Sequence, residues 1–195
     1  MSLNPEMINK VIESRRSVFQ QQYNGQTVDD AIVRKILSNA NWAPTHKLTE
    51  PWRFVVFTGD GLKKLATFQS DLYKSKTLVD GSYKEDRYQN LLTKPMLSSH
   101  IIAVGMKRDE KNSVPEIEEI GAVFCAVENM YLTATGYGVG CYLSTGGVTY
   151  FEEAKEFFGL SKNDKLLGFF HLGMPKSVLP EGKRKAIEDK VTWVS

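Results

Sequence analysis

The chain of 195 residues has few of the residues that bind metals or form disulfides, with only two cysteines and three histidines. Cys125 and Cys141 both lie among apolar neighbours, where a thiol packs as a small hydrophobic group. His46, His100 and His171 stand singly, with no second histidine three or four residues away. These numbers exclude a zinc-ribbon framework, and we expect a reduced, cytoplasmic protein.

An excess of charge of one sign is also missing, because 25 basic residues face 23 acidic ones and the net charge is +2. Proteins that bind nucleic acids or membrane surfaces need an excess of basic residues to neutralise the phosphates. No apolar run approaches the roughly 20 residues of a membrane span. The N-terminal sequence MSLNPEMINKVIESRR lacks the apolar core of a signal peptide. We therefore predict no nucleic-acid partner and no membrane association.

The length predicts one domain over residues 1–195, which has room for a core but not for separate cofactor and substrate domains. Helices are expected after a cap at Asn4, after a cap at Thr27, over 62–72, 115–135 and 150–159, and in the polar segment 74–94. Strands are expected over 53–58, 100–106, 166–173 and 191–194, with a glycine-spaced turn leading into Cys-Tyr-Leu at 141–143. Because these elements do not repeat as βαβ units, we assign the fold to the α+β class.

Two of these segments carry further predictions. The helix over 115–135 is the expected spine of the core, and its buried side should carry Ile117, Ile120, Gly121, Phe124, Val127, Tyr131 and Ala134. The polar segment 74–94 is either a mobile lid or an ordinary solvated surface.

Arg15, Arg16 and Ser17 follow the first helix, and two guanidinium groups with a hydroxyl can bind a phosphate. The basic cluster Lys183, Arg184 and Lys185 offers a second phosphate contact. The alternatives are a basic pair that stabilises a helix end and a solvated tail. The glycines of Gly-Tyr-Gly-Val-Gly follow a helix instead of a strand, so they predict a tight turn and not a dinucleotide fingerprint.

Together, five motifs in this order resemble the nitroreductase family of flavoproteins, most closely its small members. They are Arg-Arg-Ser after the first helix, Ala-Pro with Glu-Pro-Trp over 43–52, the long helix ending in Gly-Tyr-Gly-Val-Gly, Leu-Gly-Met-Pro over 172–175, and the Arg-Lys tail. The resemblance implies a mixed, mostly antiparallel sheet flanked by helices. It also implies an intertwined homodimer that binds FMN at the subunit interface and uses NADH or NADPH as reductant.

The resemblance also assigns site residues. Arg15, Arg16, Ser17 and Arg184 would contact the FMN phosphate and ribityl chain. Trp42 and His46 would contact the flavin from the loop over 42–52, which we call the proline loop because it contains Pro44 and Pro51. Leu143, Ser144 and Thr145 would lie along the isoalloxazine. Electrons would pass through FMN, by a ping-pong cycle, to a nitroaromatic, a quinone or a similar small-molecule acceptor, with no residue acting as catalytic acid or base. A cation suits the phosphate, and hydroxyls and backbone amides suit the flavin edge.

The proline loop departs from the larger members of that family, which have Asn and Gln where this chain has Leu48 and Glu50. The usual amide contacts to the flavin are therefore missing or replaced, and His46 is the expected substitute donor. Three alternatives stay open: a flavin-binding or sensing module without turnover, a specialised member such as a dehalogenase, an enone reductase or a flavin-consuming enzyme, and a phosphate-binding module without flavin.

Overall fold

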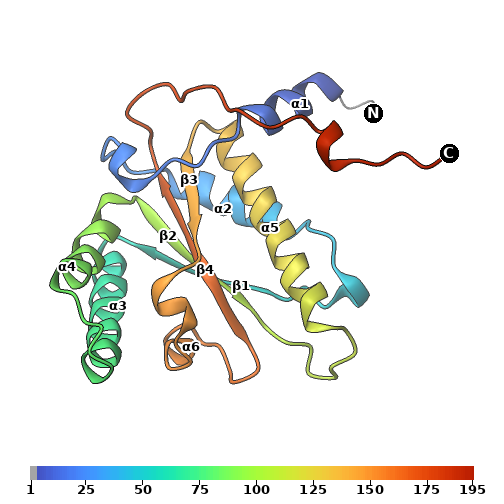
Figure 1. Ribbon diagram of the computed structural model, residues 1–195. Coiled ribbons are helices and arrows are strands. Elements are labelled where there is room, and N and C mark those ends of the chain that lie inside the picture. Colours follow the sequence, from blue (N-terminus) through green and yellow to red (C-terminus); the bar gives the residue numbers. More distant parts are fainter. Residues whose placement is uncertain (1–3) are drawn as a thin grey trace.

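The computed structural model describes residues 4–195 and is built around a four-stranded sheet. The strands are β1 (Trp52–Thr58), β2 (His100–Met106), β3 (Gly140–Ser144) and β4 (Lys165–Gly173), and their order in the sheet is β1-β2-β4-β3 (Figure 1). All three strand pairs are antiparallel, and one isolated parallel bridge joins Ser17 to Cys141. The predicted α+β class and the mostly antiparallel sheet are confirmed.

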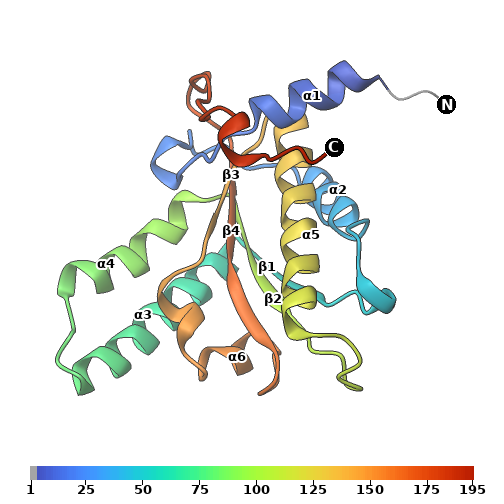
Figure 2. The same cartoon turned by 45° about the vertical axis from the view of Figure 1, so that its right-hand side comes forward.

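Helices cover both faces of this sheet. They are α1 (Pro5–Ser14), α2 (Asp30–Ala40), α3 (Asp60–Val79), α4 (Glu85–Thr93), α5 (Glu116–Gly136) and α6 (Ala154–Phe157). Short 3-10 turns are η1 (Gln20–Gln22), η2 (His46–Leu48), η3 (Lys94–Leu97), η4 (Gly147–Tyr150) and η5 (Glu188–Lys190). Figure 2 shows α2 and α5 on one face of the sheet and α3, α4 and α6 on the other.

The alternation of side chains along β2 divides the core into two layers, because successive strand residues point to opposite faces. Ile102 and Val104 pack with the cluster under α2 and α5, whereas Ile101 and Ala103 pack with the cluster under α3 and α6. Since both faces are covered, the strand is a continuous buried run. The sequence predicted its bounds correctly.

Capping residues set the starts of the first two helices. Asn4 caps α1 by accepting the Glu6 N–H, and Pro5 occupies the first helical position, as predicted. The prediction of Thr27 as the cap of α2 is wrong, because Asp29 accepts the Ala31 N–H and the helix begins at Asp30. A carboxylate in this position also interacts favourably with the helix dipole.

The bounds of α5 agree with the prediction, but its buried face differs. Glu119, Ala122, Val123, Ala126, Val127, Met130 and Ala134 are buried. Ile117 is 73% exposed and Phe124 is 40% exposed, and Gly121 is exposed as well. The buried face is rotated relative to the prediction, and it includes Glu119, which turns inward and pairs with Arg108.

Four further predictions are corrected or sharpened. The segment 74–94 contains the end of α3, a turn and α4. The expected helix over 150–159 shortens to α6, which is followed by Gly159 in the left-handed region. Cys125 is exposed, and only Cys141 packs in the core. The expected strand over 191–194 does not form, because no strand lies beside this exposed segment in the described chain.

Within residues 4–195, the helices are too short or too polar to cross a membrane. The same part of the chain contains no group of three or more His, Cys, Asp or Glu residues arranged to hold a metal ion.

Candidate functional site

A hollow lined by four cationic and four acidic side chains lies between α1, α5 and the C-terminal tail. It has a volume of about 1010 Å³, and its lining includes Arg15, Arg16 and Arg184 together with Glu6, Glu13, Glu128 and Glu181. Arg15 and Arg16 are adjacent in the sequence, and the fold brings Arg184 from the C-terminal tail to the same hollow. We call this space the arginine hollow.

The tail reaches the arginine hollow because it packs on Arg16. The Arg16 guanidinium donates to the carbonyls of Glu13 and Pro180, at 2.6 and 3.1 Å. A Cβ on Gly182 would lie 2.4 Å from the Arg16 guanidinium carbon, so any larger residue there would displace the guanidinium group from its present position. This contact sets the position of Arg184 two residues later. Arg16 is therefore largely used in holding the tail.

Arg15 keeps most of its donors free. Its guanidinium lies 5.1 Å from the centre of the Tyr131 ring and 4.0 Å from a Glu128 carboxylate oxygen, and its side chain is 19% exposed. The Tyr131 hydroxyl accepts the Leu143 N–H at 2.6 Å. Burial raises the pKa of Tyr131, although the Leu143 N–H acts in the opposite direction, so its ring stays neutral. Arg15 is thus linked to β3 through one tyrosine.

The turn before β3 explains the glycines of the sequence motif. Gly138 has a φ of +68°, which ends α5 in the left-handed region. Gly140 faces Val18, and a Cβ there would lie 3.0 Å from the valine side chain. Val18 donates its N–H to the Cys141 carbonyl at 2.9 Å. The glycine turn therefore positions the segment after Arg15 against the edge strand β3, which confirms the predicted tight turn.

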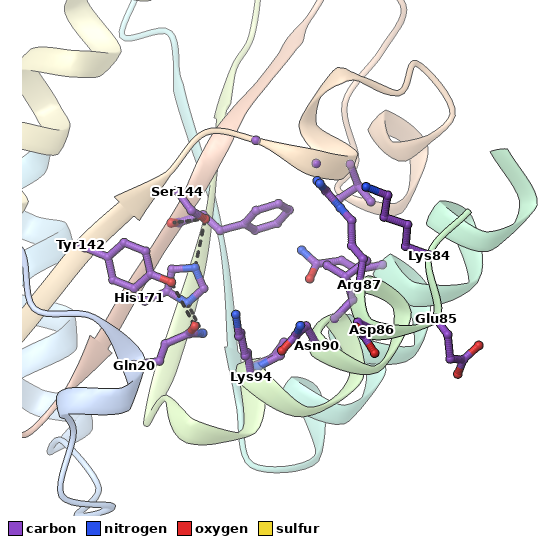
Figure 3. A pocket seen from close by; sticks show the side chains of 17 residues that line it. Gln20, Lys84, Glu85, Asp86, Arg87, Asn90, Lys94, Tyr142, Ser144 and His171 are labelled. Carbon is purple, nitrogen blue, oxygen red and sulfur yellow. Dashed lines mark hydrogen bonds between the residues drawn. The ribbon is translucent and has the colours of Figure 1, made fainter. Parts of the chain in front are cut away.

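A second cavity of about 680 Å³ opens on the other side of β3 (Figure 3). We call it the α4 cavity. It is lined by Gln20, Gln69, Lys84, Glu85, Asp86, Arg87, Asn90, Leu91, Lys94, Pro95, Tyr142, Ser144, Gly146, Gly147, Val148, Phe169 and His171. Of the predicted site residues, only Ser144 lies here.

The sheet side of the α4 cavity carries a hydrogen-bonded chain of four side chains (Figure 3). The Tyr142 hydroxyl donates to Gln20 Oε1 at 3.0 Å, and Gln20 Nε2 lies 2.9 Å from His171 Nδ1. His171 Nε2 lies 3.1 Å from Ser144 Oγ. The Tyr142 and His171 rings stack at 4.5 Å with an angle of 9°.

This chain assigns the tautomer of His171. Because the Gln20 oxygen accepts from Tyr142, its amide nitrogen donates to Nδ1, and the imidazole proton is placed on Nε2. His171 then donates to Ser144 Oγ, whose own hydrogen is free for the Phe169 carbonyl at 3.4 Å or for a ligand. Ser144 is therefore arranged as a hydrogen-bond donor at the edge of the cavity.

Burial keeps His171 neutral, lowering its pKa to about 3 from the ordinary value of 6.5. The unfolded chain therefore binds a proton below about pH 6.5 that the folded protein does not, so stability falls as the pH drops from there towards 3. Between pH 7 and pH 5, we expect the free energy of unfolding to fall by about 2 kcal/mol more in the wild type than in His171→Gln. Urea denaturation at both pH values measures this difference, and parallel pH dependences would contradict it.

The proline loop lies elsewhere on the molecule. His46 Nδ1 lies 2.5 Å from a carboxylate oxygen of Glu118, near the start of α5, and Trp42 is 83% exposed. Lys47, Leu48 and Glu50 all have positive φ, with values of 51°, 54° and 42°. Such conformations are uncommon outside glycine and concentrate at functional sites.

Within one chain, the predicted site residues lie at three separate places and along β3. Arg15, Arg16 and Arg184 line the arginine hollow, whereas Ser144 lines the α4 cavity. Trp42 and His46 lie in the proline loop, and Leu143 packs against the core cluster under α5. Ser17 and Thr145 are exposed beside the two ends of β3.

Sequence reasoning missed the buried chain of Gln20, Tyr142 and His171. One signal was available, because His171 interrupts an otherwise apolar strand. Its partners come from separate segments, so no local pattern could identify them.

Comparisons with known proteins agree with the fold and with the sequence motifs. The sequence model described as "Nitroreductase family" matches residues 12–174. The "Putative NAD(P)H nitroreductase YfhC" of Bacillus subtilis (strain 168) is 27% identical over 188 residues, which cover 95% of this chain and 93% of that protein. The chain therefore belongs to the nitroreductase family.

Solved structures are similar over almost the whole chain. A nitroreductase-like family protein from Bacillus cereus superposes with a TM-score of 0.81 and 26% identity, covering 100% of this chain and 98% of that one. The FMN-dependent nitroreductase NfnB from Mycobacterium smegmatis, solved in complex with NADPH, has a TM-score of 0.75 at 14% identity, with 98% and 99% of the two chains covered.

Proposed function

We propose that the protein is an FMN-dependent oxidoreductase that transfers electrons from NADH or NADPH to small electron-poor acceptors such as nitroaromatics and quinones. The observation that carries this proposal is the convergence of Arg15, Arg16 and Arg184 beside the edge strand β3. Membership of the nitroreductase family and the FMN and NADPH named for NfnB support the same cofactors.

The residues at the arginine hollow fit the phosphate end of FMN. A phosphate accepts several charge-assisted hydrogen bonds, and a guanidinium group donates two in parallel. Arg15 has donors to spare, and Arg184 is brought close by the packing of the tail on Arg16. The acidic residues on the same lining limit the net charge of the hollow. Phosphate binding therefore depends on direct hydrogen bonds from Arg15 more than on the overall electrostatic potential of the hollow.

The outer edge of β3 fits the flavin ring. Leu143 and Thr145 flank Ser144, whose hydroxyl is arranged as a donor by His171. Carbonyl oxygens of a flavin are acceptors for such a group. β3 borders the α4 cavity through Tyr142 and Ser144 and is linked to Arg15 through Tyr131. A ligand along this edge would therefore extend from the arginine hollow to the α4 cavity.

Bound FMN would supply the redox chemistry, taking a hydride from NADH or NADPH and giving two electrons to the acceptor. In the overall reaction a quinone becomes a hydroquinone, with one proton from the hydride and one from water. The chain itself contributes binding and orientation. His171 is held neutral by burial and is therefore no proton donor near neutral pH.

A second copy of the chain would bring the three groups of site residues together. In one copy, His46 contacts Glu118 at one end of α5, and Arg15 contacts Glu128 towards the other end. Ten residues of helix separate these contacts by about 15 Å. Antiparallel packing of two α5 helices about a two-fold axis would place the proline loop of one copy beside Arg15 of the other.

Exposed apolar residues support a homodimer. Ile117 and Phe124 on α5 are exposed, and the tail that runs past α1 in Figure 1 ends in Trp193, which is 91% exposed. β1 has a free edge, where another chain can add a strand. We therefore propose an interface that combines α5 with the C-terminal tail.

The colour of the purified protein tests this function. A yellow protein that is bleached by NADH or NADPH without oxygen, and regains its colour when a quinone is added, is the expected result. A colourless protein that takes up no FMN contradicts the proposal. A yellow protein that neither donor bleaches indicates a flavin-binding module without turnover.

A further inference from the structure

The α4 wall of the α4 cavity carries three cations that pair with no carboxylate in the described part of the chain. Lys84, Arg87 and Lys94 line the cavity, and their side chains form no ion pair and no hydrogen bond within residues 4–195. Other cations of the chain, such as Lys76 and Lys155, are paired with carboxylates. Free cations beside one another repel, and an anion placed between them relieves this repulsion.

Arg87 occupies a defined position at the mouth of the cavity. Its guanidinium lies 5.5 Å from the centre of the Tyr73 ring, and one of its nitrogens comes within 3.8 Å of the position of a Cβ on Gly147. It therefore spans from α4 towards the turn after β3. Figure 3 shows Arg87 and Lys84 pointing in the same direction, towards this turn.

The acidic residues of the same wall do not neutralise this pair. Glu85 is held by the Tyr83 hydroxyl at 2.6 Å and by the Gln89 amide at 2.8 Å. Figure 3 shows its carboxylate pointing away from the cavity. Asp86 lines the cavity but forms no ion pair with Arg87 or Lys84 among the described residues.

The rest of the cavity suits a flat ring. Leu91, Pro95, Val148 and Phe169 give an apolar lining, and Tyr142 adds an aromatic ring beside them. A volume of about 680 Å³ is enough for a small aromatic molecule. The cavity thus combines a neutral, partly aromatic floor with a cationic mouth.

We propose that the α4 cavity selects electron acceptors that carry an anionic group, such as a carboxylate, on an aromatic ring. The ring lies over the floor near Ser144, and the anion pairs with Arg87 and Lys84. This inference rests on the proposed function, because it places the acceptor next to the edge of β3 that we assign to the flavin. It adds to the proposed function a preference for acceptors that carry an anionic group.

The experiment compares two acceptors of the same shape, 4-nitrobenzoate and its neutral methyl ester, on the FMN-loaded protein. In Arg87→Gln, kcat/KM for 4-nitrobenzoate should fall about five- to tenfold, while kcat/KM for the ester stays unchanged. Lys84→Gln should act in the same direction. Calorimetric titration of the oxidised protein with 4-nitrobenzoate should show the same weakening of binding, independently of turnover.

Lys74→Gln is the matched control, because Lys74 is an exposed cation on the neighbouring helix α3 that does not line the cavity. It should leave both acceptors unchanged. The proposal is overturned if Arg87→Gln lowers kcat/KM equally for the two acceptors. It is also overturned if Lys74→Gln lowers kcat/KM for 4-nitrobenzoate as much as Arg87→Gln does.

The reductant gives a separate outcome. If Arg87→Gln slows bleaching by NADPH but not by NADH, the cations bind the 2′-phosphate of the reductant, and the acceptor assignment is wrong. Failure of the proposed function looks different, because the wild-type protein would then not be bleached by either donor.

Discussion

Replacing Glu119 by alanine is expected to lower the free energy of unfolding by about 3–5 kcal/mol. Its side chain is 0% exposed and is bonded to the Arg108 guanidinium. It also accepts the Asp109 N–H at 2.8 Å. The alanine variant leaves the partly buried Arg108 charge without its carboxylate and leaves one backbone N–H without its acceptor. Urea denaturation at neutral pH measures the change.

The effect of Glu119 should extend to the loop between β2 and α5. Arg108 also donates to the Val114 carbonyl at 3.0 Å and to Asn112 Oδ1 at 3.2 Å, so the same guanidinium organises the whole connection. Glu118→Ala is the matched control, because this neighbour is half exposed and surface ion pairs contribute at most about 1 kcal/mol. Equal losses in the two variants would show that the burial of Glu119 has no special importance.

Replacing Arg15 by alanine is expected to weaken FMN binding by about 1.5–3 kcal/mol, which is roughly ten- to 150-fold in Kd. The reason is the loss of a charge-assisted contact from the arginine with the most free donors in the arginine hollow. Arg15→Lys keeps the charge but loses the planar pair of donors, so its effect should be intermediate. Equilibrium titration of the apoprotein with FMN measures both.

Folding of the apoprotein should change little in Arg15→Ala, because the ion pair that Arg15 forms within residues 4–195 is with Glu128, which lies 4.0 Å away and is half exposed. Arg34→Ala serves as the control, since Arg34 is an exposed arginine on α2 that does not line the arginine hollow. An unchanged Kd for FMN in Arg15→Ala would remove this residue from the phosphate site.

Elements with strong local signals could be predicted from the sequence. The β2 strand is a continuous apolar run between polar segments, and the α1 start combines an asparagine cap with a proline. Such patterns depend on neighbours in the chain, which the sequence displays directly. The α+β class followed from the absence of βαβ repeats, and the mostly antiparallel sheet followed from the resemblance to the nitroreductase family.

The buried face of α5 could not be predicted in the same way. Apolar periodicity favoured Ile117 and Phe124, and it gave no reason to bury a glutamate. Glu119 is buried in an ion pair with Arg108, which comes from another segment, while Ile117 and Phe124 stay exposed in the single chain. The buried face of α5 therefore involves a contact between distant segments, which periodicity along one helix does not reveal.

At the candidate site, too, some residues could be predicted from the sequence and others could not. Arg15 and Arg184 carry a chemical signal that does not depend on the fold, so they could be named in advance. The chain from Tyr142 through Gln20 and His171 to Ser144 joins three separate segments, and only the three-dimensional structure reveals it.

The place of β4 in the sheet has a consequence for synthesis of the protein. β4 lies between β2 and β3 although it is the last strand in the chain. Until residues 165–173 leave the ribosome, β1 and β2 can pair, but β3 has no strand beside it and α5 has only part of the surface on which it packs. The order of translation therefore delays closure of the sheet, and with it formation of both cavities beside β3, until β4 has been made.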